Sequence, residues 1–210
     1  MNIGILGSGN MGAALGKGWA AKGHRIIFSF SRDRTKLQRL AREAGDPARA
    51  GSVAEAVAAS DVLMLAVPAD QLDQVLGEAG LLAGKTIITC VSGLPPDFSG
   101  QTMGLATDLT TSIAEQIAQR APGAMVVEAF NSTFAEIVAA DSRRFGADRA
   151  GVFYCGDDAA AKRTVAMLIE DCDYDAVDVG PLVVAHSLEM LSSAWVQLAA
   201  ATQILWTESP

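Results

Sequence analysis

The segment from Gly7 to Gly12 holds the first residues of the chain whose types and spacing could do chemistry. It reads Gly7, Ser8, Gly9, Asn10, Met11, Gly12 and matches the pattern G-x-G-x-x-G. Glycines at these positions allow a tight turn, a close approach of the backbone to a pyrophosphate, and close packing of a helix on a strand. The first N–H groups of that helix are free to bind phosphate. The segment is therefore predicted to bind the pyrophosphate of a dinucleotide.

A second group of candidate residues follows the next apolar run. NAD-binding chains usually carry Asp or Glu there to accept from the ribose 2′-OH, whereas this chain has Ser31 and Arg32. A hydroxyl and a guanidinium suit a 2′-phosphate, and Lys36 could add a further charge one helical turn on. Asp33 is predicted to be a helix N-cap. The expected cofactor is therefore NADP(H).

Further candidate cofactor contacts come from the ends of two later predicted strands, where ligands bind in sheets of this kind. Pro68 is expected to shape a turn against the cofactor ribose, and Ser92 to face the nicotinamide. The residues expected to contact the cofactor on this ground are Ala66, Val67, Pro68, Gln71, Val91 and Ser92.

The elements that must position these residues alternate between strand and helix patterns, which predicts an α/β fold with a doubly wound parallel sheet. Residues 1–180 are predicted to form an NADP-binding Rossmann domain. Gly180 and Pro181 then break the chain before a long C-terminal helix, so residues 181–210 are predicted to be a helical extension. This extension is expected to complete the substrate cleft. The predicted strands cover 3–6, 25–30, 49–51, 62–67, 86–91, 125–130, 152–155 and 176–179, and Ser92–Asp108 is predicted to be a long functional loop.

Composition limits the classes of partner. The formal net charge is −8 and no basic face is evident, which argues against nucleic acid. All 16 Lys and Arg lie before Thr164, so the first part of the chain is nearly neutral and suited to an anionic cofactor. The three cysteines match no metal spacing and are expected to be reduced thiols. Met190–Trp206 is uncharged but judged too polar and too short to span a membrane. A cytoplasmic protein without membrane, metal or nucleic-acid partners is expected.

With these residues in hand, the chain resembles the coenzyme F420-dependent NADP oxidoreductase family. The resemblance rests on the glycine-rich segment, on Ser31-Arg32 with Lys36, and on Val67-Pro68. Two further motifs, each before a helix, extend it to nearly the whole chain: Cys155-Gly156-Asp157-Asp158 and Asp178-Val179-Gly180-Pro181-Leu182.

The resemblance implies hydride transfer between the nicotinamide and a deazaflavin, coenzyme F420, held in a cleft between the Rossmann domain and the C-terminal part. Such a transfer needs proximity and orientation more than acid–base groups, and no catalytic residue is assigned. The residues expected on the acceptor side are Asn131, Thr133, Phe134, Gly180, Pro181 and Leu182. Asn131 and Thr133 stand where archaeal members of the family have His and Ile, so the acceptor stays open between F420, a flavin, a quinone-like compound and a metal chelate.

Two other functions remain possible at this level. One is reduction of a small organic substrate, although related reductases carry a larger C-terminal domain, often with a catalytic Lys. The other is a non-catalytic NADP(H)-binding or sensor module. The apolar terminal helix also predicts a homodimer.

Overall fold

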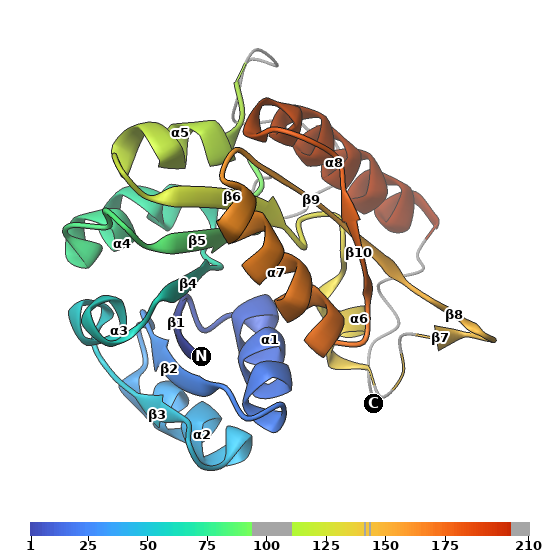
Figure 1. The fold of residues 1–210 in the computed structure, drawn as a ribbon. Helices are drawn as coiled ribbons and strands as arrows, with labels where there is room; N and C mark the ends of the chain where they lie inside the picture. Colours follow the sequence, from blue (N-terminus) through green and yellow to red (C-terminus); the bar gives the residue numbers. More distant parts are fainter. Residues whose placement is uncertain (94–110, 141, 143, 203–210) are drawn as a thin grey trace.

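The computed structural model describes residues 1–93, 111–140, 142 and 144–202. Its centre is a mostly parallel eight-stranded sheet with helices on both faces (Figure 1). The strands of this sheet are β1 (Asn2–Leu6), β2 (Arg25–Ser29), β3 (Arg49–Ala50), β4 (Val62–Leu65), β5 (Thr86–Thr89), β6 (Met125–Ala129), β9 (Gly151–Gly156) and β10 (Asp175–Asp178). The predicted α/β fold is therefore confirmed. Most of the predicted loop Ser92–Asp108 lies outside the described residues.

The order of the strands places the ligand-binding edge of the sheet. Along the sheet it runs β3-β2-β1-β4-β5-β6-β9-β10, and the strands from β3 to β6 are parallel. The chain winds outwards from β1 in one direction and from β4 in the other. The crevice between the carboxyl ends of β1 and β4 is therefore the topological switch point, where such sheets bind ligands.

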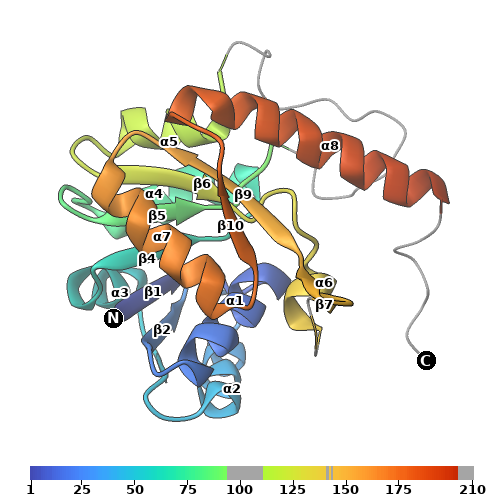
Figure 2. The same ribbon diagram turned by 45° about the vertical axis from the view of Figure 1, so that its right-hand side comes forward.

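Helices cover both faces of the sheet and bury two apolar layers (Figures 1 and 2). One layer lies under α1 (Asn10–Ala21), α2 (Arg34–Ala44), α6 (Ala135–Ala139) and α7 (Ala159–Asp171). The other lies under α3 (Val53–Ala59), α4 (Leu72–Ala79), α5 (Ile113–Arg120) and the start of α8 (Ala185–Thr202). Short 3₁₀ turns, η1 (Ala69–Gln71) and η2 (Leu182–Val184), precede α4 and α8. All four residues of β4 are buried, as expected for a strand covered on both sides.

Two strands run against the predicted direction. β9 is antiparallel to β6, and β10 is parallel to β9. A parallel return must carry the chain back along the length of the strand, usually through an α-helix. The helix between β6 and β9 is α6, whose 5 residues extend only about 7.5 Å. The chain therefore re-enters the sheet from the carboxyl edge, after a small hairpin of β7 (Arg144–Phe145) and β8 (Asp148–Arg149) that the sequence did not predict.

The long terminal helix α8 lies across the end of the sheet and begins beside α5 (Figure 2). By length and composition, the described stretch Leu182–Ala199 could cross a membrane, with a mean hydropathy of 1.2 over 18 residues. From its sequence, the overlapping stretch Met190–Trp206 is predicted to be too short and too polar to span a membrane. In this structure 39% of Leu182–Ala199 is buried inside the protein, and the buried side chains include Leu188 and Glu189. We therefore interpret α8 as a helix docked on the Rossmann-type domain.

Candidate functional site

The glycine-rich segment forms the turn between β1 and α1. Gly7 has φ +116°, a left-handed conformation that favours glycine. Helix α1 begins at Asn10 with Gly9 as its N-cap, and no side chain caps it. Its first turn also contains no acidic residue. The amide groups at this positive helix end are therefore available to an anion, as a pyrophosphate site requires.

The space around these glycines distinguishes two roles. A Cβ on Gly12 would lie 2.0 Å from the backbone oxygen of Gly7, so Gly12 is needed for α1 to pack on the turn. A Cβ on Gly9 would meet nothing within 4 Å, so Gly9 faces open space where a ligand could approach. This division matches the roles that the sequence pattern predicted.

The residues predicted to bind the 2′-phosphate lie at the end of β2 and the start of α2. Phe30 adopts φ +57°, which is uncommon for a bulky residue, and it turns the chain from β2 toward α2. Arg32 is exposed and Lys36 half-buried. Among the described residues neither forms an ion pair. Asp33 does not neutralise Arg32, because its carboxylate caps α2 and accepts from the backbone N–H of Thr35 at 2.8 Å. The hydrogen bonds from Thr35 lower the pKa of Asp33, and the predicted N-cap is confirmed.

Two adjoining cavities follow the path expected for the cofactor. The first measures about 390 Å³ and lies over the glycine turn. The second measures about 280 Å³ and lies between the start of α2 and the end of α4. They share Phe30, Ser31, Arg32 and Gln71. The predicted cofactor residues that line the first cavity are Gly7, Ser8, Gly9, Ser31, Arg32, Lys36, Ala66, Val67, Pro68 and Gln71.

The remaining predicted cofactor residues occupy other places. Asn10 and Ser92 line a third cavity, described next. Met11 packs against the core of the α1 face, and Val91 is buried with 2% of its surface exposed. Neither side chain lines either cofactor cavity. Sequence reasoning also missed lining residues that come from separate elements, and these are Arg34, Gln74 and Glu78.

The third cavity, about 260 Å³, lies on the acceptor side of the predicted site. It brings together Asn10 at the start of α1, Ser92 after β5, and the segment from Asn131 to Glu136 after β6. Phe130 precedes this segment with φ +68°, so the chain turns sharply at the carboxyl end of β6. Helix α8 closes the cavity with Ser192, Trp195 and Val196. The predicted acceptor residues Asn131, Thr133 and Phe134 are therefore gathered in one cavity.

The other three predicted acceptor residues do not line this cavity. The backbone oxygen of Gly180 accepts from the N–H of Gly156 and from Nζ of Lys162. Leu182 is buried, and its N–H donates to Asp157 at 2.9 Å. The direction of β10 explains the difference. Its last residue, Asp178, is level with Ala129 at the end of β6, and the chain continues from there beside Gly156, away from the cavity. The Gly180–Leu182 segment, with Pro181, therefore connects β10 to α8.

Two buried carboxyl groups behind the third cavity were not predicted. Glu128 on β6 and Glu189 on α8 are both 0% exposed. Burial, together with the neighbouring Glu189, raises the pKa of Glu128 well above its ordinary value. Burial also raises the pKa of Glu189, to about 7. A lone acid within the apolar run of β6 was the available sequence signal for Glu128.

The fold and the site define the class of this protein: it is a Rossmann-type protein with a dinucleotide-binding site at the switch point of its sheet. Residues 2–93 match the family model described as NADP oxidoreductase, coenzyme F420-dependent. A solved structure assigned as an F420-dependent NADP reductase from Arthrobacter sp. FB24 superposes with a TM-score of 0.85 and 27% identity. The match covers 97% of this chain and 95% of that one. The predicted resemblance to the coenzyme F420-dependent NADP oxidoreductase family is thereby confirmed.

Other similar proteins carry oxidoreductase names. The chain is 27% identical over 189 residues to Metalloreductase STEAP3 of Rattus norvegicus, which covers 90% of this chain and 36% of that protein. A reductive aminase from Aspergillus terreus, solved with NADPH4, has a TM-score of 0.68 at 21% identity, covering 97% of this chain and 63% of that one, and supports the fold alone. The chain spans about a third of the length of the curated relatives it matches.

Proposed function

We propose that this protein is an NADP(H)-dependent oxidoreductase that transfers hydride between the nicotinamide and a deazaflavin (coenzyme F420) or flavin-type acceptor. The observation that carries the proposal is the meeting of two cavities at the carboxyl edge of the sheet. Gly9 lines the cofactor cavity and Asn10, the next residue, lines the acceptor cavity. A nicotinamide bound along this path would face Ser92 and Asn131.

The chemistry of the acceptor cavity supports transfer between two cofactors. Among the described residues that line it, Glu136 is the one with an ionisable side chain. The others offer hydroxyl, amide and apolar groups. Hydride transfer from nicotinamide to a flavin-like ring needs the two rings held close and in orientation, and the cofactors supply the reactive atoms. A cavity without a cluster of acid–base groups suits this reaction.

A metal chelate is the second candidate acceptor. The similarity to Metalloreductase STEAP3 over 90% of this chain favours it. Reduction of a small organic substrate and a non-catalytic NADP(H)-binding or sensor role remain the alternatives from the sequence. The similar reductive aminase has a longer chain, since this protein covers only 63% of it.

The test is oxidation of NADPH by the purified protein, followed by the loss of nicotinamide absorbance. F420, FMN, FAD and a ferric chelate are offered in turn, with NADH as the control donor. Turnover with F420 or a flavin, and much slower turnover with NADH, is the expected result. Turnover with the ferric chelate alone would favour the second candidate. Tight NADPH binding without turnover of any acceptor would contradict the proposed activity and favour the sensor role.

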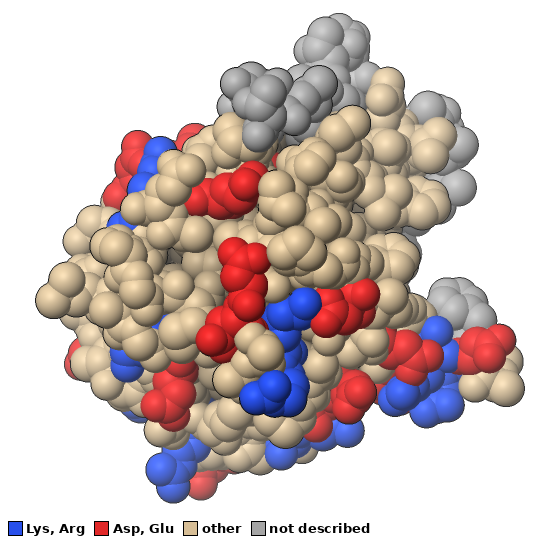
Figure 3. Space-filling view, turned by 45° about the horizontal axis from the view of Figure 1, so that its top comes forward, with Lys and Arg blue, Asp and Glu red and all other residues tan. Residues whose placement is uncertain are grey.

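We also propose that the protein is a cytoplasmic homodimer. In this proposal α8 both closes the acceptor cavity and forms the dimer interface. Its inner face reaches the acceptor cavity, whereas its outer face leaves large apolar side chains in solvent. Met190 is 45% exposed and Leu198 56%. In Figure 3 the surface at the upper right, around α8, is free of charged side chains. An uncharged apolar helix face of this kind is typical of a surface that pairs with its own copy.

The double change Met190→Glu and Leu198→Glu should therefore convert a dimer into a monomer at micromolar concentration. The physical reason is that each symmetric interface would receive four carboxylates in place of apolar contacts. Analytical ultracentrifugation measures the result. Met167→Glu on α7, at a residue that is 45% exposed, is the matched control and should leave the dimer intact. Sedimentation of the unaltered protein as a monomer would contradict the proposal.

A further inference from the structure

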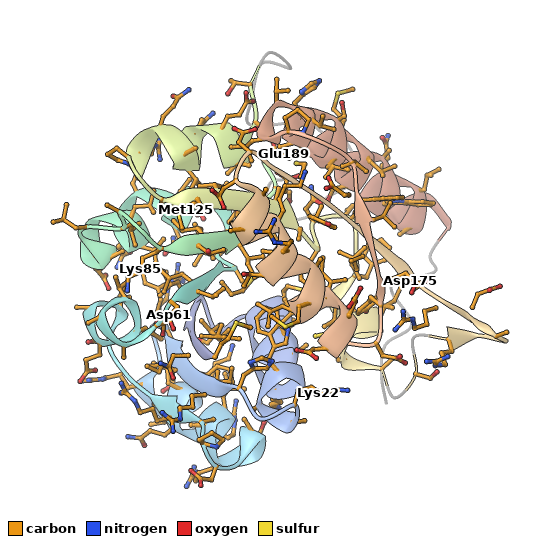
Figure 4. All side chains as sticks on the ribbon, viewed as in Figure 1. Lys22, Asp61, Lys85, Met125, Asp175 and Glu189 are labelled. Carbon is orange, nitrogen blue, oxygen red and sulfur yellow. The ribbon has the colours of Figure 1, made fainter. Side chains whose placement is uncertain are left out.

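The buried carboxyl groups of Glu128 and Glu189 meet behind the acceptor cavity, from two different elements. Glu128 is the fourth residue of β6, and Glu189 lies in the second turn of α8. Figure 4 labels Glu189 at the end of α8 that lies next to α5. The two carboxyl groups are close enough to interact, because each affects the pKa of the other. Among the described residues, no lysine, arginine or histidine forms an ion pair with either.

Each carboxyl group uses one oxygen for a defined partner. Oε1 of Glu128 accepts from Nδ2 of Asn131, a residue of the acceptor cavity. Oε1 of Glu189 accepts from the backbone N–H of Ala114 at 3.3 Å. Ala114 lies in the first turn of α5, so Glu189 sits at the positive end of that helix. Neither contact uses an Oε2 atom, so the Oε2 atom of each residue is left to interact with the other carboxyl group.

Within the described part of the chain, the remaining oxygens have no donor. Oε2 of Glu128 and Oε2 of Glu189 are both buried without a hydrogen-bond partner. Leaving two such atoms unsatisfied is costly, and placing two bare carboxylates together in a buried site is costlier still. One proton between the two Oε2 atoms removes both difficulties, because one carboxyl group then donates to the other.

We propose that Glu128 and Glu189 share a proton between their Oε2 atoms, and that this acid pair positions Asn131 and α8 at the acceptor cavity. The proton belongs to Glu128, because that carboxyl group has no helix end to stabilise a charge. Glu189 carries the negative charge when the pair ionises, because the amides at the start of α5 face it. The positioning role rests on the proposed function of the cavity, whereas the proton sharing does not.

A second contact between α8 and the acceptor cavity lies one helical turn further along the helix. Oγ of Ser192 donates to the backbone oxygen of Asn131 at 2.6 Å. Glu189 and Ser192 are three residues apart and therefore lie on the same face of the helix. Asn131 is thus held through its side chain by Glu128 and through its backbone by Ser192. Loosening the acid pair should release one wall of the cavity without touching the glycine turn.

The pair also makes the stability of the protein depend on pH. The pKa of Glu189 is about 7 in the folded protein and near 4.5 when unfolded, so the folded state binds more protons between these values. The stability that this group contributes is present below about pH 4.5 and is lost as the pH rises through about 7. Glu115 on α5 is a further acid that raises the pKa of both residues, and Glu128 in turn raises the pKa of the thiols of Cys90, just after β5, and Cys155 on β9.

Two glutamine variants test where the proton lies. In Glu128→Gln the amide can donate to Glu189 and accept from Asn131, and so it imitates the neutral acid. In Glu189→Gln the amide cannot both accept from Ala114 and receive the proton of Glu128. We therefore expect Glu128→Gln to have the higher melting temperature of the two, by roughly 5 °C or more at pH 7. Equal melting temperatures, or the reverse order, would overturn the assignment of the proton to Glu128.

The pH dependence adds a readout that does not need activity. The melting temperature of Glu189→Gln should rise relative to that of the unaltered protein between pH 5 and about pH 8, since this change removes the carboxyl group whose pKa burial raises to about 7. The infrared band of a protonated carboxyl group should be present in the unaltered protein at neutral pH and absent from Glu128→Gln. A constant difference in melting temperature and an unchanged infrared spectrum would both count against the pair.

Glu128→Met tests the positioning role. It keeps a side chain of similar length but gives Asn131 no acceptor and Glu189 no proton. Its dissociation constant for NADPH should stay within about twofold, while its KM for F420 or FMN should rise about tenfold, which corresponds to one lost hydrogen bond. Glu128→Gln should restore the KM. If neither acceptor is turned over by the unaltered protein, the proposed function fails while the melting and infrared tests still decide the proton sharing. An unchanged KM in Glu128→Met would refute the positioning role.

Discussion

Replacing Gly12 by alanine should destabilise the protein by about 3 kcal/mol, at the upper end of the usual cost of overpacking. A Cβ at this position would lie 2.0 Å from the backbone oxygen of Gly7 and 3.0 Å from a side-chain carbon of Ile5. Both neighbours belong to β1 or its turn, so helix α1 must move as a unit. For a domain of this size, the melting temperature should fall by about 6 °C or more. Thermal unfolding followed by circular dichroism measures it.

Gly9→Ala is the matched control for this change. It alters the same motif, but its Cβ would meet nothing within 4 Å. Its free energy of unfolding should therefore stay within about 1 kcal/mol of the unaltered protein. Its affinity for NADPH should nevertheless fall about tenfold or more, because the new methyl group stands where the pyrophosphate approaches. Equal losses of stability in the two variants would mean that the helix packing described here is wrong.

Arg32→Ala should weaken NADPH by roughly 1.5–3 kcal/mol, the usual worth of a hydrogen bond to a charged group, and NADH by much less. This corresponds to about a tenfold to hundredfold rise in the dissociation constant for NADPH. The side chain is exposed at the wall shared by both cofactor cavities. Fluorescence titration with each dinucleotide measures the two constants.

Arg39→Ala, on the same helix α2, controls for the loss of one positive charge. Arg39 lies close to Glu43, with 3.7 Å between Nε and the carboxylate, and lines neither cofactor cavity. This variant should bind both dinucleotides almost normally. An equal fall in NADPH and NADH affinity for Arg32→Ala would show that Arg32 does not read the 2′-phosphate, and Lys36 would then be the next residue to change.

The cofactor side of the site could be predicted because its residues act locally. The glycine spacing fixes a turn and a helix start within six residues. Ser31, Arg32 and Asp33 follow directly from the end of β2, and Asp33 caps the next helix as its position indicated. Each interaction of this kind joins residues that are close in sequence, so short-range rules of turns and caps suffice.

The acceptor side was predicted only in part. The segment from Asn131 to Phe134 was found through the resemblance, and it lines the cavity. Gly180, Pro181 and Leu182 were placed in the same cleft, but the direction of β9 moves them away from it. In the connection between β6 and β9 the helix α6 has only 5 residues. The sequence pattern predicted a helix there without indicating that it was too short to carry the chain back along the sheet.

The sequence by itself determined the class of fold, the glycine turn and the residues suited to a 2′-phosphate, because these follow from local spacing and residue chemistry. Only the tertiary structure decided that two strands run in the opposite direction and which side chains of α8 line the acceptor cavity. It also brought Glu128 and Glu189, 61 positions apart in the chain, into one buried pair. The physical reason is that a buried carboxyl group is defined by what surrounds it. Its neighbours come from β6, α5 and α8, which meet only when the chain has folded.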